Sequence, residues 1–262
     1  MTDIHRVHLT KAKLAAMPEA ERSLLLLLGH ASNEINVLTK LILMTRKDDP
    51  PVKLIDHVEA GQILVLMRVL IGKLHEAWRL FGKRFQADRA IREKYSPQLS
   101  PKATGALTEL NRHFGNGSLL TRIRNNISFH YVDDNDLIEA NFQRLPETEA
   151  WDFYLSEAIV NSFYFASELV VQGGLSSLSM GKPAPTVPTT DFSDDAAAFR
   201  KIYDAVIEIS CHITELFGQV IAEILEAHIP DVEVTTVEIP NGPKLSTYSL
   251  PFFVDVERGA RG

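Results

Sequence analysis

Apolar residues recur at three- and four-residue spacing along most of the chain, which is the period of an amphipathic helix. The first such stripe runs from about Glu19 to Thr45 and stops before the sequence Asp48-Asp49-Pro50-Pro51. A second and longer stripe runs from about Ile55 to Lys94, and a short one from about Lys102 to Phe114. The pattern therefore predicts three helices in this half, with the long ones packed nearly antiparallel.

Three more helices are predicted further along the chain. One begins at the capping residue Ser118 and ends near Asp133, one covers Glu149 to Gln172, and the last long helix runs from Ser193 to about His228. Since almost the whole chain has this period, the fold class that follows is all-α. We expect an up-and-down bundle of about five main helices.

The two ends of the chain lack the helical pattern. Residues 1–18 are polar and are assigned to an N-terminal extension, and residues 19–229 are assigned to the helical bundle. After Pro230 apolar residues alternate with polar ones, and Asn241-Gly242 is a sequence that favours a tight turn. Residues 230–262 are therefore predicted to form a C-terminal extended arm or β-hairpin.

One short motif stands out on the helix that follows Ser118. Arg124 is followed directly by Asn125, and His130 lies six residues after Arg124. The apolar position Ile127 marks the core-facing side, so we expect His130 to be largely buried and Arg124 to flank the same polar pocket. A satisfied core histidine and an ordinary ion pair to the arginine remain the alternatives.

This motif resembles the signature of the HEPN superfamily, in which an Arg is followed by a polar residue and then, after a short interval, by a His. The resemblance extends with useful specificity from Glu19 to Asp134, and it implies a helical bundle that cleaves or binds RNA. It also implies that His130 is the general acid or base, that Arg124 holds the phosphate, and that Asn125 orients one of them or binds a phosphate oxygen. No metal and no cofactor are expected. Two copies of the motif would face one cleft, so a homodimer is expected, and a toxin–antitoxin or defence system is the expected setting.

Charge is distributed unevenly along the chain. Residues 1–134 contain 20 Lys and Arg against 14 Asp and Glu, whereas residues 135–262 contain 7 against 20, which gives net charges of +6 and −13 within a total of −7. The cations gather in residues 68–94, in the half that carries the motif. Arg68, Arg79 and Lys83 are therefore predicted to bind nucleic acid, with a solvated helix face as the alternative.

The remaining composition favours a cytoplasmic protein that does not enter a membrane. The single cysteine, Cys211, excludes an intramolecular disulfide, and we expect it to pack as a small apolar residue. Residues 1–17 do not have the pattern of a signal peptide, and the most apolar stretch, Ile63 to Ile71, is too short to span a bilayer.

A second functional hypothesis uses the same residues without catalysis. Arg124 and His130 would then form a buried polar contact in a catalytically silent helical protein. Such a protein would dimerise or bind a nucleotide through the motif helix. A protein partner is a further expectation for the chain.

Overall fold

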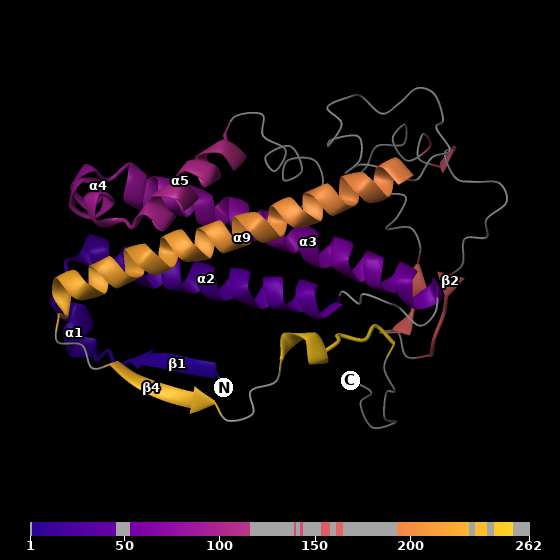
Figure 1. Cartoon of the computed structure of the whole chain (residues 1–262), viewed down its shortest axis with the longest axis horizontal. Helices are drawn as coiled ribbons and strands as arrows, with labels where there is room; N and C mark the ends of the chain where they lie inside the picture. The colour runs from indigo at the N-terminus through magenta and orange to yellow at the C-terminus, as the bar shows by residue number, and fades with distance from the viewer. Residues whose placement is uncertain are drawn as a thin grey trace. The chain divides into compact units, whose positions relative to one another are not determined.

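A computed structural model describes residues 2–45, 53–115, 139, 142–143, 153–157, 161–164, 193–230, 234–239 and 244–253. Within these residues the chain is predominantly helical, so the predicted all-α helical bundle is confirmed (Figure 1). Its helices are α1 (Lys11–Ala16), α2 (Glu19–Thr45), α3 (Lys53–Phe81), α4 (Arg89–Tyr95), α5 (Pro101–His113) and α9 (Ser193–His228). The shorter turns are η1 (Gly82–Gln86), η2 (Ser96–Gln98) and η6 (Leu245–Thr247). The strands are β1 (Thr2–Val7), β2 (Phe153–Tyr154), β3 (Phe163–Tyr164) and β4 (Val234–Ile239).

The chain divides into two compact units, and the division falls within α2, α3 and α9. Unit 1 consists of Met1–Thr39, Lys73–Ser118 and Ile207–Thr247. Unit 2 consists of Lys40–Gly72, Leu119–Val206 and Tyr248–Gly262. Each unit therefore has contributions from segments that are far apart in the sequence.

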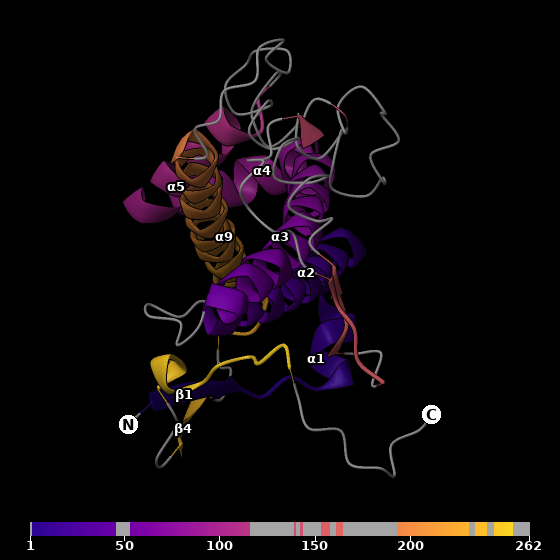
Figure 2. The same ribbon diagram turned by 90° about the vertical axis from the view of Figure 1, so that its right-hand side faces the viewer.

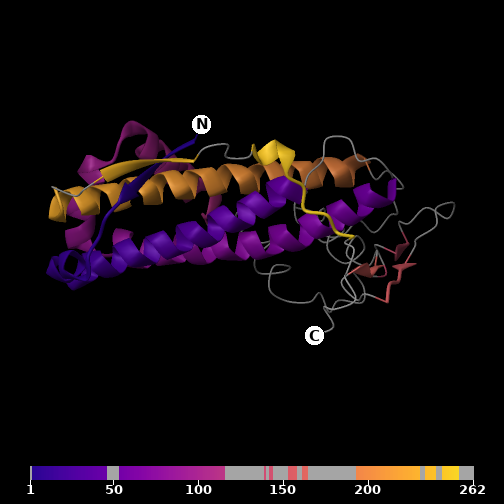
Figure 3. The ribbon, with the colours of Figure 1, turned by 90° about the horizontal axis from the view of Figure 1, so that it is seen from below.

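Unit 1 is built around its portions of the three long helices. The start of α2 lies against the end of α9, where Glu21 contacts His228, so these two helices run antiparallel (Figure 3). Further along α2, Glu34 pairs with Lys73 of α3 at 2.6 Å. The stripes predicted from the sequence are buried between the helices: Leu24, Leu28 and Ile35 of α2, Leu74, Ala77 and Phe81 of α3, and Ile213, Leu216, Val220 and Ile224 of α9. Phe217 of α9 is buried beside them.

A stack of aromatic rings forms the centre of this core. Phe81 is fully buried, and its ring is stacked on those of Trp78, Phe85 and Phe217, with centroid distances of 5.6, 4.7 and 5.6 Å. Trp78 is also stacked on Phe114, just beyond the end of α5, at 5.3 Å. Because each ring buries a large apolar area, this stack holds α3, η1, α9 and the end of α5 together.

The single helix predicted from Ile55 to Lys94 is wrong in its last third. The α-helix ends at Phe81, one π-helical turn follows at η1, and α4 begins after Asp88. The backbone of Asp88 is extended, and its carboxylate accepts a hydrogen bond from the amide of Ile91 at 3.1 Å, which caps the new helix. Phe85 is buried although it lies after the end of α3, so the apolar spacing alone did not reveal where the α-helix ends.

The C-terminal segment was predicted as an extended arm or a β-hairpin, and its described strand β4 is extended but pairs with the N-terminal strand β1 (Figure 2). The pair is antiparallel, with Thr2 opposite Ile239 and Val7 opposite Val234. Alternating polarity identifies a strand but does not identify its partner. Residues 1–18, predicted only as an extension, therefore contain β1 as well as α1.

Unit 2 contains a second correction to the predicted helices. The described residues between Glu149 and Gln172 include two short strands, β2 and β3, which pair antiparallel. Phe153 and Tyr164 are opposite each other and their rings meet edge to face. The buried ring of Phe163 packs on Gly61 of α3, where it leaves no room for a side chain. At residues 153–154 and 163–164, aromatic cross-strand pairing thus takes the place of the predicted helix.

Helix α9 has two further properties that bear on the sequence predictions. Its segment Phe199–His228 is long and apolar enough to cross a membrane, but the core helix of a bundle meets the same criterion. Cys211 is exposed, so the prediction that it packs in the core is wrong. It lies two residues after the buried Ile209, about 200° further around the helix.

Candidate functional site

The Arg124, Asn125 and His130 motif lies outside the described residues, so its expected burial stays a prediction. The three cations predicted to bind nucleic acid are described, and they belong to different units. Arg68 is half-buried in unit 2, whereas Arg79 and Lys83 are exposed in unit 1. The structure therefore gives different surroundings to residues that the sequence had grouped by charge alone.

Arg79 and Lys83 also differ in their partners. Arg79 pairs with Glu76, three residues before it on α3, at 2.6 Å. Lys83, on η1, has neither an ion pair nor a side-chain hydrogen bond to any residue that the structure describes. Of these two cations, only Lys83 keeps its charge fully available for a ligand.

The cations around Lys83 form what we call the basic segment, residues 82–94, which covers η1 and most of α4. It contains Lys83, Arg84, Arg89, Arg92 and Lys94 against the anions Asp88 and Glu93. Arg89 pairs with Glu93 at 2.7 Å, and the carboxylate of Asp88 caps α4. Both acidic groups of the segment are therefore already engaged.

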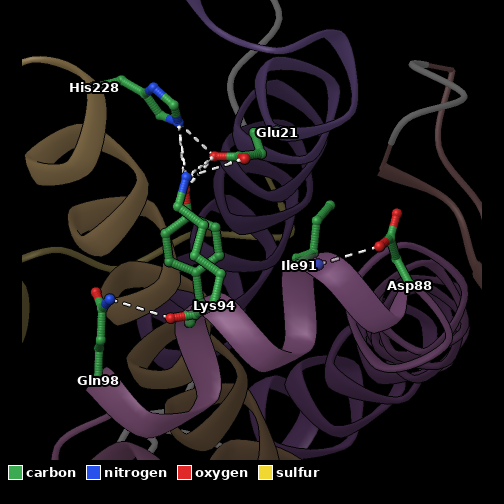
Figure 4. Close-up of polar contacts among 7 residues, drawn as sticks. Glu21, Asp88, Ile91, Lys94, Gln98 and His228 are labelled. Atoms are coloured by element: carbon green, nitrogen blue, oxygen red, sulfur yellow. Dashed lines mark hydrogen bonds and ion pairs between the residues drawn. The ribbon is translucent and has the colours of Figure 1, made fainter.

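Lys94, at the end of the basic segment, enters a separate cluster that we call the Glu21 network. The carboxylate of Glu21 on α2 accepts hydrogen bonds from the Lys94 ammonium at 3.0 and 3.1 Å and from the Tyr95 hydroxyl. His228 at the end of α9 lies with its Nε2 2.5 Å from the same carboxylate. Figure 4 shows Glu21, Lys94 and His228 pointing toward one another from three helices.

The ionisation of the network follows from its burial and its charges. Burial of Glu21 by itself raises the pKa of its carboxyl. Hydrogen bonds from Tyr95, His228 and Lys94, together with the charge of Lys94, lower this pKa by more than burial raises it, so the net pKa is below the usual value. Burial lowers the pKa of Lys94, and its interactions with Tyr95 and Glu21 more than reverse this, so that pKa is raised. Burial and the hydrogen bond to Glu21 together raise the pKa of Tyr95 to about 12. At neutral pH Glu21 is ionised, Lys94 is charged and Tyr95 is protonated.

These protonation states define what the network does chemically. The ionised carboxylate of Glu21 can only accept a hydrogen bond, and a lone pair on Nε2 of His228 would repel it at 2.5 Å. Nε2 of His228 therefore carries a proton and donates a hydrogen bond to the carboxylate. The carboxylate then has three donors, from α4 and α9. A carboxylate used in this way joins helices, and we assign the Glu21 network a structural role in unit 1.

This network was not identified from the sequence, although the positions of Glu21 and His228 each gave a signal. Glu21 falls three residues before Leu24 and seven before Leu28, on the buried stripe of α2, and His228 lies four residues after Ile224 on the buried stripe of α9. A charged residue at such a position indicates a buried polar partner. The partner itself cannot be deduced, because Glu21 and His228 are 207 residues apart.

Comparison with known proteins adds no relative to these observations. The chain matches no protein-family model, no curated protein and no solved structure. The functional proposal is therefore based on the residues of this chain.

Proposed function

We propose that this chain is a metal-independent endoribonuclease, or an RNA-binding relative, of the HEPN type. The observation that carries the proposal is the Arg124, Asn125 and His130 motif in a chain whose described part is an all-α bundle. The charge of Lys83 lies in the same half of the sequence, is exposed and has no partner among the described residues, which supports a polyanionic ligand.

The chemistry follows from the residue types. The 2′-hydroxyl of the ribose attacks the adjacent phosphorus, and the bond from phosphorus to the 5′-oxygen breaks. One imidazole accepts the 2′-hydroxyl proton and another donates a proton to the leaving oxygen, which is the work of His130 in two copies of the chain. Arg124 stabilises the extra negative charge on the phosphate, and Asn125 orients it. The products carry a cyclic 2′,3′-phosphate and a free 5′-hydroxyl.

Each copy of the motif supplies only one arginine and one histidine. We therefore infer a homodimer in which two motif helices face one cleft. Light scattering at working concentration measures this directly, and a clean monomer would contradict the shared cleft.

The test of catalysis is an RNA digestion in the presence of EDTA. We expect cleavage of RNA but not of DNA, loss of cleavage in His130→Ala, and a loss of about 100-fold or more in Arg124→Ala. His30→Ala is the matched control, because the side chain of His30 is 70% exposed on α2, and it should retain full activity. Circular dichroism of each variant checks that it is folded.

The alternative, a catalytically silent helical protein that dimerises or binds a nucleotide, makes a different prediction. If His130 only packs, His130→Ala lowers the melting temperature because a buried polar contact is broken. A wild-type protein without activity on varied RNAs, together with a destabilised His130→Ala variant, would exclude the enzyme.

A further inference from the structure

We propose that Lys83, Arg84 and Arg92 form a binding surface for the phosphate backbone of RNA on η1 and α4. The inference extends the proposed function by naming where the nucleic acid binds. It also replaces the grouping of Arg68, Arg79 and Lys83 made from the sequence alone.

The first observation is that two neighbouring cations have no counter-charge in the part of the chain that the structure describes. Lys83 and Arg84 follow each other on η1, both are exposed, and neither has an ion pair or side-chain hydrogen bond among the described residues. The next residue, Phe85, is fully buried and anchors this turn in the core. The two charges are therefore carried on a turn that is fixed by its own packing.

The second observation brings Arg92 to the same turn. Its guanidinium donates a hydrogen bond to the backbone carbonyl of Gln86, the last residue of η1, at 2.8 Å. A guanidinium has five N–H donors, so most of them stay available for a phosphate. Because this contact already orients Arg92, less side-chain entropy is lost when a ligand binds.

Neither acidic group of the basic segment forms an ion pair with Lys83, Arg84 or Arg92. Asp88 caps the amide of Ile91, and Glu93 pairs with Arg89. Three positive side chains thus lie on one turn and the helix that follows it, and none of them pairs with a carboxylate of the residues that the structure describes. This chain has a net charge of −7, so such a surface is a local exception to its overall charge.

The chemistry of the surface fits a repeating phosphate backbone. It offers ammonium and guanidinium groups, which position phosphates without reading bases. Binding should therefore be independent of sequence and should weaken steeply with salt, since each phosphate contact releases counterions.

The test measures binding separately from cleavage. The probe is a fluorescent single-stranded RNA in which every 2′-hydroxyl is methylated, so the proposed reaction cannot occur. Fluorescence anisotropy of the full chain at several salt concentrations compares wild type with Lys83→Gln/Arg84→Gln. The matched control is Arg200→Gln/Lys201→Gln, a consecutive pair of exposed cations on α9 whose replacement changes the net charge equally.

We expect the Lys83→Gln/Arg84→Gln variant to bind about tenfold more weakly at low salt, and its slope of log affinity against log salt to fall by about 1.4. Arg92→Gln should weaken binding in the same direction, while the control pair stays near wild type. Equal losses in both double variants, no loss in either, or absence of RNA binding by the wild type would overturn the surface. Tighter binding of labelled polyglutamate than of the RNA would also overturn it, in favour of an acidic protein partner.

The outcomes for the surface and for the proposed reaction can be told apart. If the wild-type chain binds the methylated RNA through Lys83 and Arg84 but never cleaves unmodified RNA, the proposed ribonuclease activity is contradicted and the proposed binding surface is supported. If the Lys83→Gln/Arg84→Gln variant cleaves RNA with an unchanged KM, the proposed binding surface is contradicted and the proposed ribonuclease activity is supported.

Discussion

Replacing Glu21 by Gln tests the role assigned to the Glu21 network. The substitution keeps the size of the side chain and removes its negative charge. The remaining oxygen can still accept from Tyr95 and His228, but the new amide group then faces the Lys94 ammonium, which is also a donor.

The size of the effect follows from burial. A hydrogen bond to a charged group contributes about 1.5–3 kcal/mol, against about 1 kcal/mol for a neutral pair. Tyr95 is fully buried, whereas the side chain of Lys94 is 38% exposed, so its ion pair counts for only about 0–1 kcal/mol. We expect Glu21→Gln to lower the free energy of unfolding by about 2–4 kcal/mol. For a chain of this size that corresponds to a melting temperature lower by roughly 5–15 °C.

Urea and thermal unfolding, followed by circular dichroism, measure this loss. Glu93→Gln is the control, because it removes the same charge one residue before Lys94. Its pair with Arg89 has side chains that are 60% and 81% exposed, so we expect a change within about 0.5 kcal/mol.

The effect also has a pH signature. The pKa of Glu21 lies below its ordinary value of 4.5 in the folded chain, so the stabilisation is present above that value and is lost as the pH falls through the lowered pKa. The difference between wild type and Glu21→Gln should therefore narrow in acid. A loss no larger than that of Glu93→Gln, or a difference that is the same at about pH 3 and about pH 7, would refute the reasoning.

Three further predictions concern local features of the fold, and unfolding experiments measure all of them. The contribution of Tyr95 to stability should be full below pH 10.0 and should be lost toward pH 12, because its pKa is raised from 10.0 to about 12. Tyr95→Phe should weaken this alkaline dependence. Gly61→Ala should cost about 1–3 kcal/mol, since its Cβ would lie 2.8 Å from the Phe163 ring. By contrast, a Cβ added at Gly29 has open space, so Gly29→Ala should raise the free energy of unfolding by roughly 0.5–1 kcal/mol. Equal changes in stability for the two variants would contradict the close contact between Gly61 and Phe163. Asp88→Ala should cost about 1 kcal/mol by removing the cap of α4, and an unchanged stability would show that the cap is dispensable.

The sequence by itself determined the class of the fold and the bounds of two of its three long helices. The stripe from Glu19 to Thr45 and the one from Ser193 to His228 predicted α2 and α9 at the residues where the structure has them. This succeeded because a helix is closed by hydrogen bonds between residues four apart, and its buried face repeats with the same local period. The Arg124 and His130 motif was found in the same way, as a local pattern, and its function stays a proposal.

Only the tertiary structure decided which distant segments meet. The alternating residues of β4 identified a strand, but its partner β1 lies at the other end of the chain, and no local rule connects them. The Glu21 network likewise joins residues 207 positions apart. At η1 the apolar spacing continued unchanged from Phe81 to Phe85, so the break was invisible in the pattern. The charges of Lys83 and Arg84 were visible in the sequence. Whether a carboxylate pairs with them depends on where every other side chain lies, and among the described residues none does. Periodicity reports which side of an element is buried, whereas strand pairing and uncompensated charge depend on contacts that the order of residues does not encode locally.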